Sequence, residues 1–587
     1  MLFILLPPLL FLFYNYVFHP LFLNKLIKQN IPGPWHYKLS SFFILNDARR
    51  GRRNGVLQRL HAKYGPVVMI GPGEVSVNSP ELIKMVYLNN YPKEYITKSK
   101  TVTGFYSQFA DYGQRNMFST GDSKAHLLKR RPLQRVYSKS AVLSSQDFVQ
   151  AKVRAAMDRI REAGDGKDID VYSLFRAMAM DVVSGFLYGS KFATDLVGEL
   201  SHTSDSLEVE RSILHEFRDM GSMTFYTTLL PSLWTPVARL SGLEKCVSNV
   251  EDWVYKSFAQ ALECLVQGKR VDGSHRVKNV ITTMFEELVH DQAKPLEAGD
   301  GAGGDAGGDA EGDAGGSTHD ITREKIDAMA SEIADHAIAG HETTGTTLTY
   351  IFWELSRPCN RHWQAVLREE TKDKPDFNSL EHLPMLCAVV QEAFRLHAAI
   401  PGSEPRFVPP GETLSVSLDG TKRAIPAGTV VSGQPWCMHH SPVFGDAPDR
   451  FRPQRWLQQD DESQEEYELR IKTMNNSIFT FGQGNRMCIG MHLVALEVKL
   501  CVAAVYSEFS TEISPEWCGT IAQGDCDVRM GSSWLSTSPK HSDTRQLTDV
   551  DLMSMADSYV TNPLFEECWL RFSKLGKLGK LGKLGKL

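Results

Sequence analysis

The sequence predicts a mostly α-helical protein with small β-sheets, in which a single large domain follows an N-terminal membrane anchor. Three observations support this prediction. The first 23 residues contain no charged side chain. A Pro-rich segment then leads into mixed helix and strand patterns. Further on, residues 322–356 carry a helical pattern of unusual length.

The composition excludes several classes of protein. The chain has 587 residues, with 64 Lys and Arg against 70 Asp and Glu. Its 42% hydrophobic residues can form a deep core, which excludes wholesale disorder. The near-balanced charge argues against nucleic acid as a partner. Ten cysteines without a CxxC pair argue against a disulfide scaffold or a zinc site, so we expect reduced cysteines in a domain facing the cytosol.

Residues 1–23 have about the length of one membrane span. Lys25 and Lys28 follow at once, and positive charge on this flank predicts that the bulk of the chain stays cytosolic. A cleaved signal peptide is less favoured, because no basic region precedes the apolar run and no small-residue cleavage site follows it. Prolines within the run leave a tilted or interfacial anchor open.

The rest of the chain divides by composition. Residues 24–34 form a basic, Pro-rich hinge, and residues 35–572 form the main domain, in which residues 61–71 indicate a helix end, a Gly-Pro turn and a strand. The Gly-Asp-Ala repeats of residues 293–318 offer no apolar residue to bury, so a flexible acidic insertion is favoured over a calcium site. The Lys-Leu-Gly repeats of residues 573–587 predict a disordered tail.

The long helix should begin at a cap formed by Asp320 or Thr322 and end before Pro358. Its middle, residues 339–345, contains glycines and threonines that lower helix propensity. Such a departure is expected at functional sites. A helix that is kinked and packs closely on a neighbour is the alternative.

Within this segment three residues suggest chemistry. Gly340 would let a flat ligand lie against the backbone, and the Thr343 hydroxyl can bond the carbonyl four residues earlier. The carboxyl of Glu342, next to it, could relay protons to a bound ligand.

One cysteine stands in an unusual loop. Residues 481–490 surround Cys488 with three glycines and place Arg486 two residues before it, and a helix is expected from residue 491. A thiolate at a helix N-terminus is stabilised by free backbone N–H groups. Cys488 is therefore a nucleophile, a metal ligand or an inert buried thiol.

Several motifs together resemble the cytochrome P-450 family. The pattern F-x-x-G-x-R-x-C-x-G, met from Phe481 to Gly490, looks like the haem-ligand loop of that family. The stretch Ala339–Thr344 is similar to its oxygen-activating helix. Glu392-x-x-Arg395 and the Phe451–Trp456 segment match two further motifs in the expected order. The resemblance extends from the anchor to about Phe572, and its style is that of membrane-anchored fungal members that act in secondary metabolism.

The resemblance implies a cofactor and roles for individual residues. Cys488 would be the axial thiolate ligand of the iron of haem b, and backbone N–H groups near Ile489 and Gly490 would bond its sulfur. Gly340 would leave room for haem and O₂, while Thr343 and Glu342 would deliver protons.

Two further sets of side chains follow from the same resemblance. Glu392, Arg395 and Arg455 would form a structural ion-pair network. The cofactor would also be bound by the motif residue Phe481 and, at its propionates, by Arg486, Arg130, His126 and Arg406. His126-x-x-x-Arg130 resembles a family motif with Trp in place of His, so Arg130 is the firmer assignment of that pair.

Other segments are candidates for substrate contact by analogy. They are Phe105 to Phe109, Ile338, Ala398 to Ile400, Tyr559 and Val560.

The implied activity is a haem-thiolate monooxygenase that inserts one oxygen atom of O₂ into a lipophilic small molecule. Electrons would come from a separate NADPH-dependent reductase that docks near Cys488, and the anchor would place the protein in the endoplasmic reticulum membrane. Two alternatives remain at this point. One is a haem-thiolate isomerase or dehydratase that needs no reductase, which the Glu342–Thr343 pair disfavours; the other is a non-catalytic haem-binding membrane protein.

Overall fold

The computed structural model describes residues 24–99, 101–102, 104–200, 213–217, 234–273, 277–293, 322–374, 376–532 and 547–575, with residues 6, 10, 13, 14, 18 and 22. Among these residues there is no helix that is both long and apolar enough to span a membrane. Most of the predicted anchor, the insertion from residue 294 onward and the tail from residue 576 onward lie outside the described residues.

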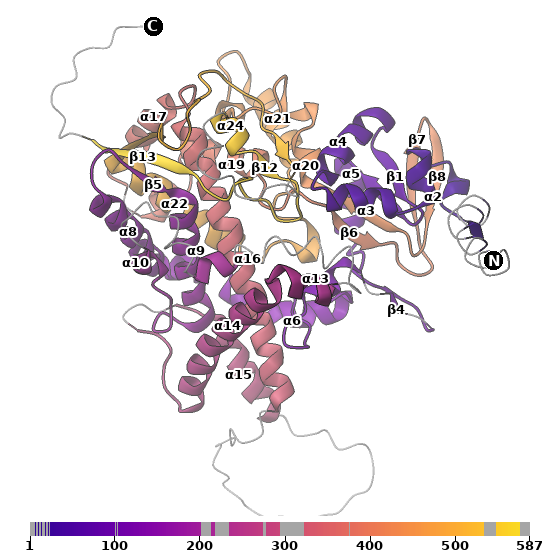
Figure 1. Cartoon of the computed structure of the whole chain (residues 1–587), viewed down its shortest axis with the longest axis horizontal. Helices are drawn as coiled ribbons and strands as arrows, with labels where there is room; N and C mark the ends of the chain where they lie inside the picture. The colour runs from indigo at the N-terminus through magenta and orange to yellow at the C-terminus, as the bar shows by residue number, and fades with distance from the viewer. Residues whose placement is uncertain are drawn as a thin grey trace, which may run out of the picture.

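Helices form most of the body of the molecule (Figure 1). The first half contains α2 (Trp35–Leu39), α3 (Phe42–Arg49), α4 (Arg53–Tyr64), α5 (Pro80–Tyr87), α6 (Ser123–Val136), α7 (Lys139–Ser144), α8 (Gln146–Ala163), α9 (Val171–Tyr188), α10 (Leu196–Glu199), α13 (Trp234–Ser241), α14 (Leu243–Val266) and α15 (Val280–Ala293). The second half contains α16 (Arg323–Ser356), α17 (His362–Thr371), α18 (Phe377–Leu380), α19 (Pro384–Leu396), α20 (Pro435–His439), α21 (Gln464–Asn476), α22 (Met491–Glu508) and α24 (Asp549–Leu552).

The described strands form small sheets. The largest has the order β1 (Val67–Gly71), β2 (Glu74–Val77), β9 (Val430–Gly433) and β6 (Glu404–Phe407), and only its β2–β9 pair is parallel. A second sheet has the order β10 (Phe509–Ile513), β13 (Trp569–Lys574) and β5 (Lys167–Asp170). Three two-stranded sheets pair β7 (Thr413–Leu418) with β8 (Thr421–Pro426), β3 (Tyr95–Ile96) with β4 (Thr101–Val102), and β11 (Met530–Gly531) with β12 (Met555–Ala556).

Two boundaries predicted from composition need refinement. The hinge is packed rather than free: Ile31 is fully buried and the Met69 N–H donates to the Pro32 carbonyl at 2.7 Å. A Cβ atom on Gly33 would lie 2.3 Å from the Met69 carbonyl oxygen, so the chain can approach β1 there only as glycine. At the other end β13 pairs with β10 through Lys574, so the predicted tail begins at least two residues too early.

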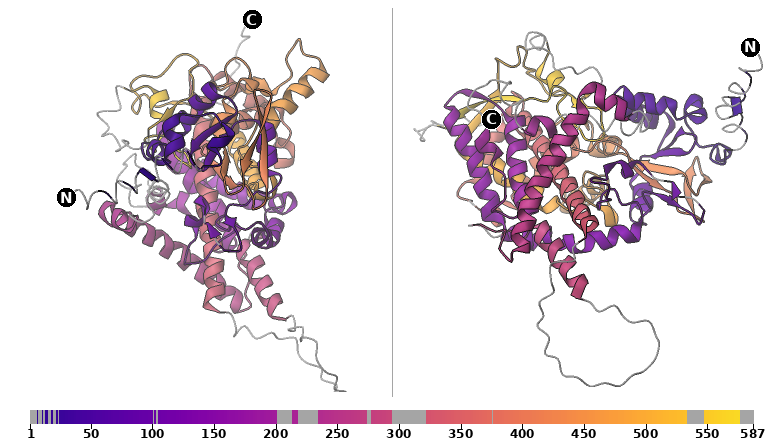
Figure 2. Two further views of the ribbon diagram at one scale, coloured as in Figure 1. Left: turned by 90° about the vertical axis from the view of Figure 1, so that its right-hand side faces the viewer. Right: turned by 60° about the horizontal axis from the view of Figure 1, so that its bottom comes forward.

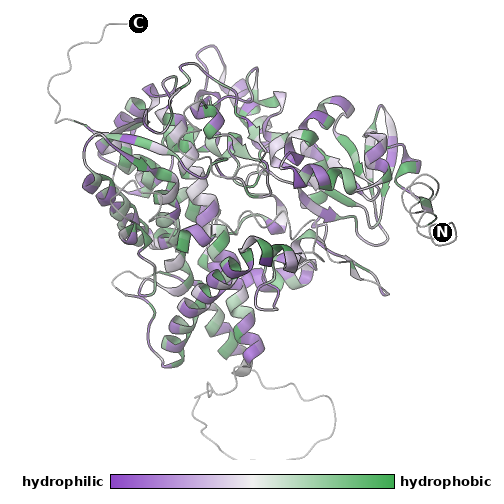
Figure 3. Cartoon of the chain, viewed as in Figure 1, coloured by the Kyte–Doolittle hydropathy of each residue, from purple (hydrophilic) through white to green (hydrophobic). Residues whose placement is uncertain are grey.

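The long helix α16 begins and ends where the sequence predicts. Thr322 occupies the N-cap position, and the helix ends at Ser356 before Arg357 and Pro358. It packs along α9, all of whose residues are buried. Figures 1 and 2 show α16 passing through the helical body, and Figure 3 shows apolar residues spread along the helices and strands around it.

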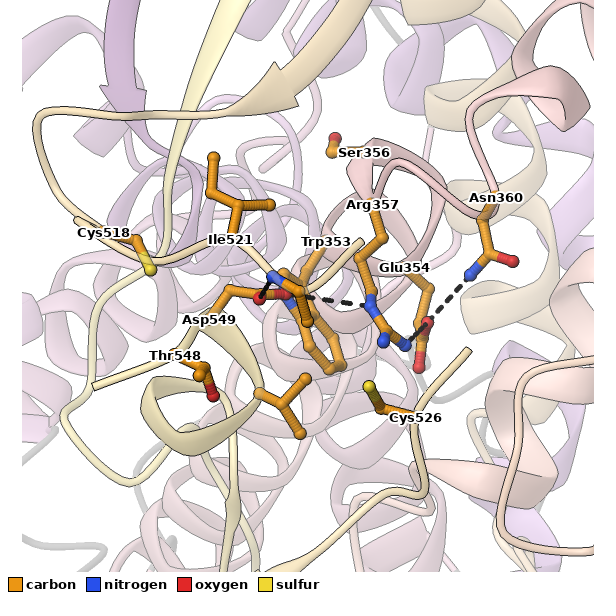
Figure 4. Close-up of polar contacts among 12 residues, drawn as sticks. Trp353, Glu354, Ser356, Arg357, Asn360, Cys518, Ile521, Cys526, Thr548 and Asp549 are labelled. Carbon is orange, nitrogen blue, oxygen red and sulfur yellow. Dashed lines mark hydrogen bonds and ion pairs between the residues drawn. The ribbon is translucent and has the colours of Figure 1, made fainter. Parts of the chain in front are cut away.

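A buried polar network fixes the C-terminal end of α16 (Figure 4). Arg357 donates to Glu354 at 3.0 Å, and its Nε atom lies 3.7 Å from a carboxylate oxygen of Asp549 on α24. The Trp353 indole N–H donates to the same Asp549 at 3.2 Å. Removing one partner would strand buried charge, so these contacts tie α16 to the C-terminal part of the chain.

Candidate active site

One face of α16 is less covered than the rest of the helix. Asp335, Ile338 and Thr343 are half-buried and Ala339 is exposed, while nearly every other residue from Met329 to Ser356 is buried. Positions three or four residues apart share a helix face. These four residues therefore line one open stripe.

Thr343 and Glu342 lie on different sides of this helix. The Thr343 hydroxyl donates to the Ala339 carbonyl at 2.8 Å, as the sequence predicted. Glu342 is buried on the side of Arg176 of α9. Burial raises the pKa of Glu342, although the charge of Arg176 opposes the rise. Its carboxyl therefore holds a proton at higher pH than an exposed one would.

Gly340 is explained by packing between helices. A Cβ atom on Gly340 would lie 2.5 Å from Cγ2 of Val183 on α9, and one on Gly345 would lie 2.6 Å from Cγ of Arg176. The absent side chain of Gly340 is therefore directed at α9, whereas the residue exposed on the open stripe is Ala339. The alternative of close helix packing accounts for this glycine.

The loop around Cys488 holds its thiol at an exposed position. The Cys488 N–H donates to the Phe481 carbonyl at 2.8 Å, and α22 begins three residues later. Although Cys488 is solvent-accessible, the protein around it desolvates the thiol and raises its pKa, while hydrogen bonds from the backbone N–H groups of Gly490 and Met491 and the charge of Arg130 lower it. The donors are Gly490, as expected, and Met491, two residues beyond the predicted Ile489. These contacts only partly offset the desolvation, and the pKa of the thiol stays raised, so a stable thiolate here needs a further positive partner such as a metal ion.

Phe481 packs its ring at 5.0 Å from that of Phe394 on α19. Gly484 has a φ of +73°, and a Cβ atom there would lie 2.2 Å from the Tyr87 carbonyl oxygen. The loop can therefore reach the end of α5 only with glycine at this position.

Five basic side chains, Arg486, Lys93, Arg130, His126 and Arg406, influence one another electrostatically, and Arg130 also interacts with the Cys488 thiol. Arg486 donates to the carbonyls of Thr120 and Gly121. Burial lowers the pKa of Arg486 to about 9, and the charge of Arg406 adds to the shift. Burial and the surrounding positive charges of Arg486, Lys93, Arg130 and Arg406 lower the pKa of His126 to about 2.

Two features indicate that this group of basic side chains is suited to bind an anionic ligand. The Nε atom of Arg130 is buried and has no hydrogen-bond partner among the described residues. Lys93, which the sequence analysis missed, is also buried, and burial together with Arg406 and Arg486 lowers its pKa. No local motif marked Lys93, because it comes from a loop before β3. A thiol next to a buried, unpartnered guanidinium suits an anionic ligand.

The predicted ion-pair residues meet in the interior, where Glu392 and Arg395 are fully buried and the Arg455 side chain is 10% exposed. Arg395 donates two hydrogen bonds to Glu392, at 2.8 and 2.9 Å, and Arg455 donates to the same carboxylate at 2.9 Å. The Trp456 indole and the Arg452 backbone also donate to Glu392, each at 2.9 Å. These donors lower the pKa of Glu392 against the effect of burial. Cations and hydrogen bonds thus keep the buried carboxylate charged.

The structure brings together most of the candidate substrate-contact segments. The Tyr559 ring lies 4.8 Å from the Phe105 ring and 6.2 Å from the Phe109 ring. The Thr561 N–H donates to the Ala399 carbonyl at 2.9 Å. Ile338 lies on the open stripe of α16. Two segments far apart in the sequence therefore form one aromatic wall, defined here as Phe105, Tyr106, Phe109, Phe118 and Tyr559.

A carboxylate–imidazole group on α16 also escaped the sequence analysis. Glu332, Asp335 and His336 have their ligand atoms within 4.8 Å of one another. Glu332 and His336 form an ion pair at 3.4 Å, and the other His336 nitrogen bonds the Tyr137 hydroxyl at 3.0 Å. Their spacing of three and four residues was a usable signal.

Comparison with known proteins accounts for this combination of residues. The sequence model of the family described as cytochrome P-450 matches residues 32–298 and 306–521. This chain belongs to the cytochrome P-450 family. Similar proteins include the cytochrome P-450 monooxygenase tazI of Aspergillus terreus, 29% identical over 490 residues, which cover 82% of this chain and 86% of the relative.

Other relatives carry names that state a reaction. Tryprostatin B 6-hydroxylase of Neosartorya fischeri is 25% identical over 537 residues, covering 90% of this chain and 81% of the relative. Fusicoccadiene C-8 hydroxylase of Phomopsis amygdali is 26% identical over 510 residues, covering 84% and 85%. The protein is thus a haem-thiolate monooxygenase, an oxidoreductase that uses O₂ and electrons derived from NADPH.

Proposed function

We propose that this cytochrome P-450 oxidises a lipophilic secondary metabolite at the open stripe of α16, with Cys488 as the ligand of the haem iron. The observation that supports this most directly is the exposed Cys488 next to the buried Arg130, whose Nε atom has no hydrogen-bond partner among the described residues. Arg130, His126, Arg406 and Arg486 would bind the propionates.

Haem, when bound, supplies the redox chemistry of oxygen insertion, and the chain supplies binding, orientation and protons. The backbone N–H groups of Gly490 and Met491 stabilise negative charge on the Cys488 sulfur. The Thr343 hydroxyl can donate or accept a proton on the open stripe, and Glu342, whose pKa is raised, can hold one nearby.

The substrate class is inferred from two sources. The aromatic wall, and Ile338 on the open stripe, would offer apolar surfaces to a substrate. The named relatives hydroxylate tryprostatin B and fusicoccadiene, as their names state. A lipophilic fungal product similar in size to tryprostatin B or fusicoccadiene fits both the apolar surfaces and the relatives' names. Specificity for one such product would follow from the shape of the aromatic wall.

The proposal has a spectroscopic test. Reduced holoenzyme exposed to CO should show the red-shifted Soret band of thiolate ligation. A correctly folded, haem-loaded protein with an unshifted band would contradict Cys488 as the ligand. Metabolite profiling of a strain lacking the gene would then identify the product that disappears.

The reductase is proposed to dock on the outer face of α6. Lys124, Arg131 and Arg135 are exposed there, whereas Arg130 of the same helix is buried near Cys488. An acidic partner bound at this face would lie close to the thiolate side of the site. Charge reversal by Arg131→Glu and Arg135→Glu should slow reduction by the reductase, most strongly at low salt, and leave reduction by dithionite unchanged. Lys422→Glu on β8 is the matched control, because Lys422 is exposed on a hairpin outside this face.

A membrane anchor in residues 1–23 and location at the endoplasmic reticulum remain part of this proposal. The support is the uncharged sequence followed by Lys25 and Lys28. Deletion should stop at residue 23, because Leu26 and Ile31 are buried against the domain. The truncated protein should be haem-loaded and leave the membrane fraction; continued membrane binding would point to a second membrane contact.

A further inference from the structure

The carboxylate of Glu404, at the first position of β6, joins two phenols from distant parts of the chain. The Tyr106 hydroxyl donates to its Oε2 atom at 2.7 Å, and the Tyr559 hydroxyl donates to its Oε1 atom at 3.2 Å. Tyr106 belongs to the 3₁₀ helix η3 (Phe105–Phe109), and Tyr559 follows β12. Each oxygen of this carboxylate therefore holds a different segment of the aromatic wall.

The same carboxylate reaches the cations beside Cys488. The Arg406 guanidinium donates to the Tyr106 hydroxyl at 2.7 Å, and its Nη2 atom lies 3.6 Å from Oε2 of Glu404. The Tyr106 hydroxyl thus accepts from a cation and donates to an anion. Such a chain of charge-assisted bonds is short and directional, so its members constrain one another.

The backbone of Glu404 is held as firmly as its side chain. The Tyr87 hydroxyl donates to the Glu404 carbonyl, and the Gly433 N–H donates to that hydroxyl at 2.8 Å. The Arg406 guanidinium also lies 4.9 Å from the centre of the Tyr87 ring. The sheet thus fixes the position of the Glu404 carboxylate. The positions of Tyr106 and Tyr559 in the aromatic wall depend in turn on that carboxylate.

We propose that Glu404 is a positioning residue for substrate selection: its carboxylate couples the aromatic wall, through Tyr106 and Tyr559, to Arg406 at the haem edge. This inference rests on the proposed function, because it takes the wall as the substrate side of the site. Glu404 touches neither substrate nor iron in this role. The Glu404 carboxylate accepts hydrogen bonds from the hydroxyls of Tyr106 and Tyr559. These bonds fix the positions of the two rings, and with them the positions of Phe105 and Phe109, which pack against them.

Two probes of different length test the coupling in the holoenzyme. Imidazole is short and should bind the haem iron without reaching the wall, whereas the phenyl ring of 4-phenylimidazole should reach it. Glu404→Gln should weaken binding of 4-phenylimidazole by about tenfold relative to imidazole, the size expected for losing a hydrogen bond to a charged group. Tyr559→Phe should give a smaller loss in the same direction, and Glu404→Asp should restore part of the selectivity. Glu412→Gln, an exposed carboxylate near the same sheet, should change neither affinity.

Hydrogen exchange provides a readout that does not depend on haem chemistry. In Glu404→Gln, residues 104–118 and 555–561 should both exchange faster, while α22 should not. An unchanged ratio of the two affinities, together with unchanged exchange in both segments, would overturn the proposal. Should Glu404→Gln not fold, the same two measurements on Tyr559→Phe decide the question. A wild-type protein without the shifted CO band would refute the proposed function instead, and the exchange experiment would still report on Glu404.

Discussion

Thr343 donates its hydroxyl to the Ala339 carbonyl at 2.8 Å, on the open stripe in the middle of α16 that the described neighbouring elements leave less covered. Without this bond, the Ala339 carbonyl would accept only a backbone hydrogen bond of the helix. The bond also orients the Thr343 hydroxyl along the open stripe. Thr347 makes the same type of bond to the Thr343 carbonyl at 2.8 Å but is buried. The two threonines therefore differ in what they face rather than in their local geometry.

Thr343→Ala should keep the shifted CO band and uncouple NADPH consumption from product. Product per NADPH should fall on the order of a hundredfold, because a proton-transfer group is lost while the iron ligand remains. The measurement is the ratio of product to NADPH consumed. Thr347→Ala is the control, and equal coupling in the two variants would remove Thr343 from proton delivery.

Cys488→Ala should abolish both the shifted CO band and turnover, because no other described thiol stands at this loop. Cys526→Ala, which changes a partly exposed thiol outside the loop, should leave both intact. The two CO difference spectra provide the comparison. Retention of the shifted band in Cys488→Ala would mean that another residue is the ligand.

Gly340→Ala should destabilise the protein by about 1–3 kcal/mol, since the new methyl group would overlap Val183. Val183→Ala in the same chain should recover much of this loss, because it removes the atoms that collide. Thermal unfolding of the single and double variants measures the coupling. Loss of haem from Gly340→Ala without rescue by Val183→Ala would favour the clearance role that the sequence suggested.

Arg455→Leu should cost about 3–5 kcal/mol, because it leaves part of the charge of Glu392 uncompensated in the interior. The free energy of unfolding and the haem content report the effect. Arg450→Gln is a suitable comparison, since Arg450 forms its ion pairs at the surface, and it should change both measurements little. A similar cost for the two arginines would argue against a special role of the buried network.

The pH dependence of stability should carry a contribution from Glu497 on α22. Burial, with the nearby charge of Asp181, raises the pKa of Glu497 to about 8, and one of its buried carboxylate oxygens has no hydrogen-bond partner among the described residues. A raised folded-state pKa means that the folded chain binds the extra proton. Its stabilising contribution is therefore complete below the ordinary pKa of about 4.3 and is lost as pH rises toward 8, by up to about 1.4 kcal/mol per pH unit.

Glu497→Gln should flatten this part of the curve of unfolding free energy against pH. Glu465→Gln, an exposed carboxylate on α21, should leave the curve as it is. An unchanged slope in Glu497→Gln would mean that the group is ionised in the folded protein.

Linear motifs revealed those parts of the site that lie close together in the chain. The loop around Cys488, the Glu392–Arg395 pair and the 34-residue helix α16 could all be predicted, because their geometry follows from local spacing. The family assignment rested on the same motifs. The helix caps and the strand after Gly65 were equally local.

Only the tertiary structure decided which residues meet across the sequence. Lys93 joins the cations beside Cys488, and Glu404 joins Tyr106 to Tyr559, through contacts between segments hundreds of residues apart. Gly340 is a second example. Its motif could be recognised in the sequence, but only the structure shows that a Cβ atom at this position would point at α9. Sequence by itself determined the family and the long helix, and it predicted Cys488 as the ligand. Packing decided which face of that helix stays open and which charges gather around it, because burial and electrostatic balance are properties of the assembled chain.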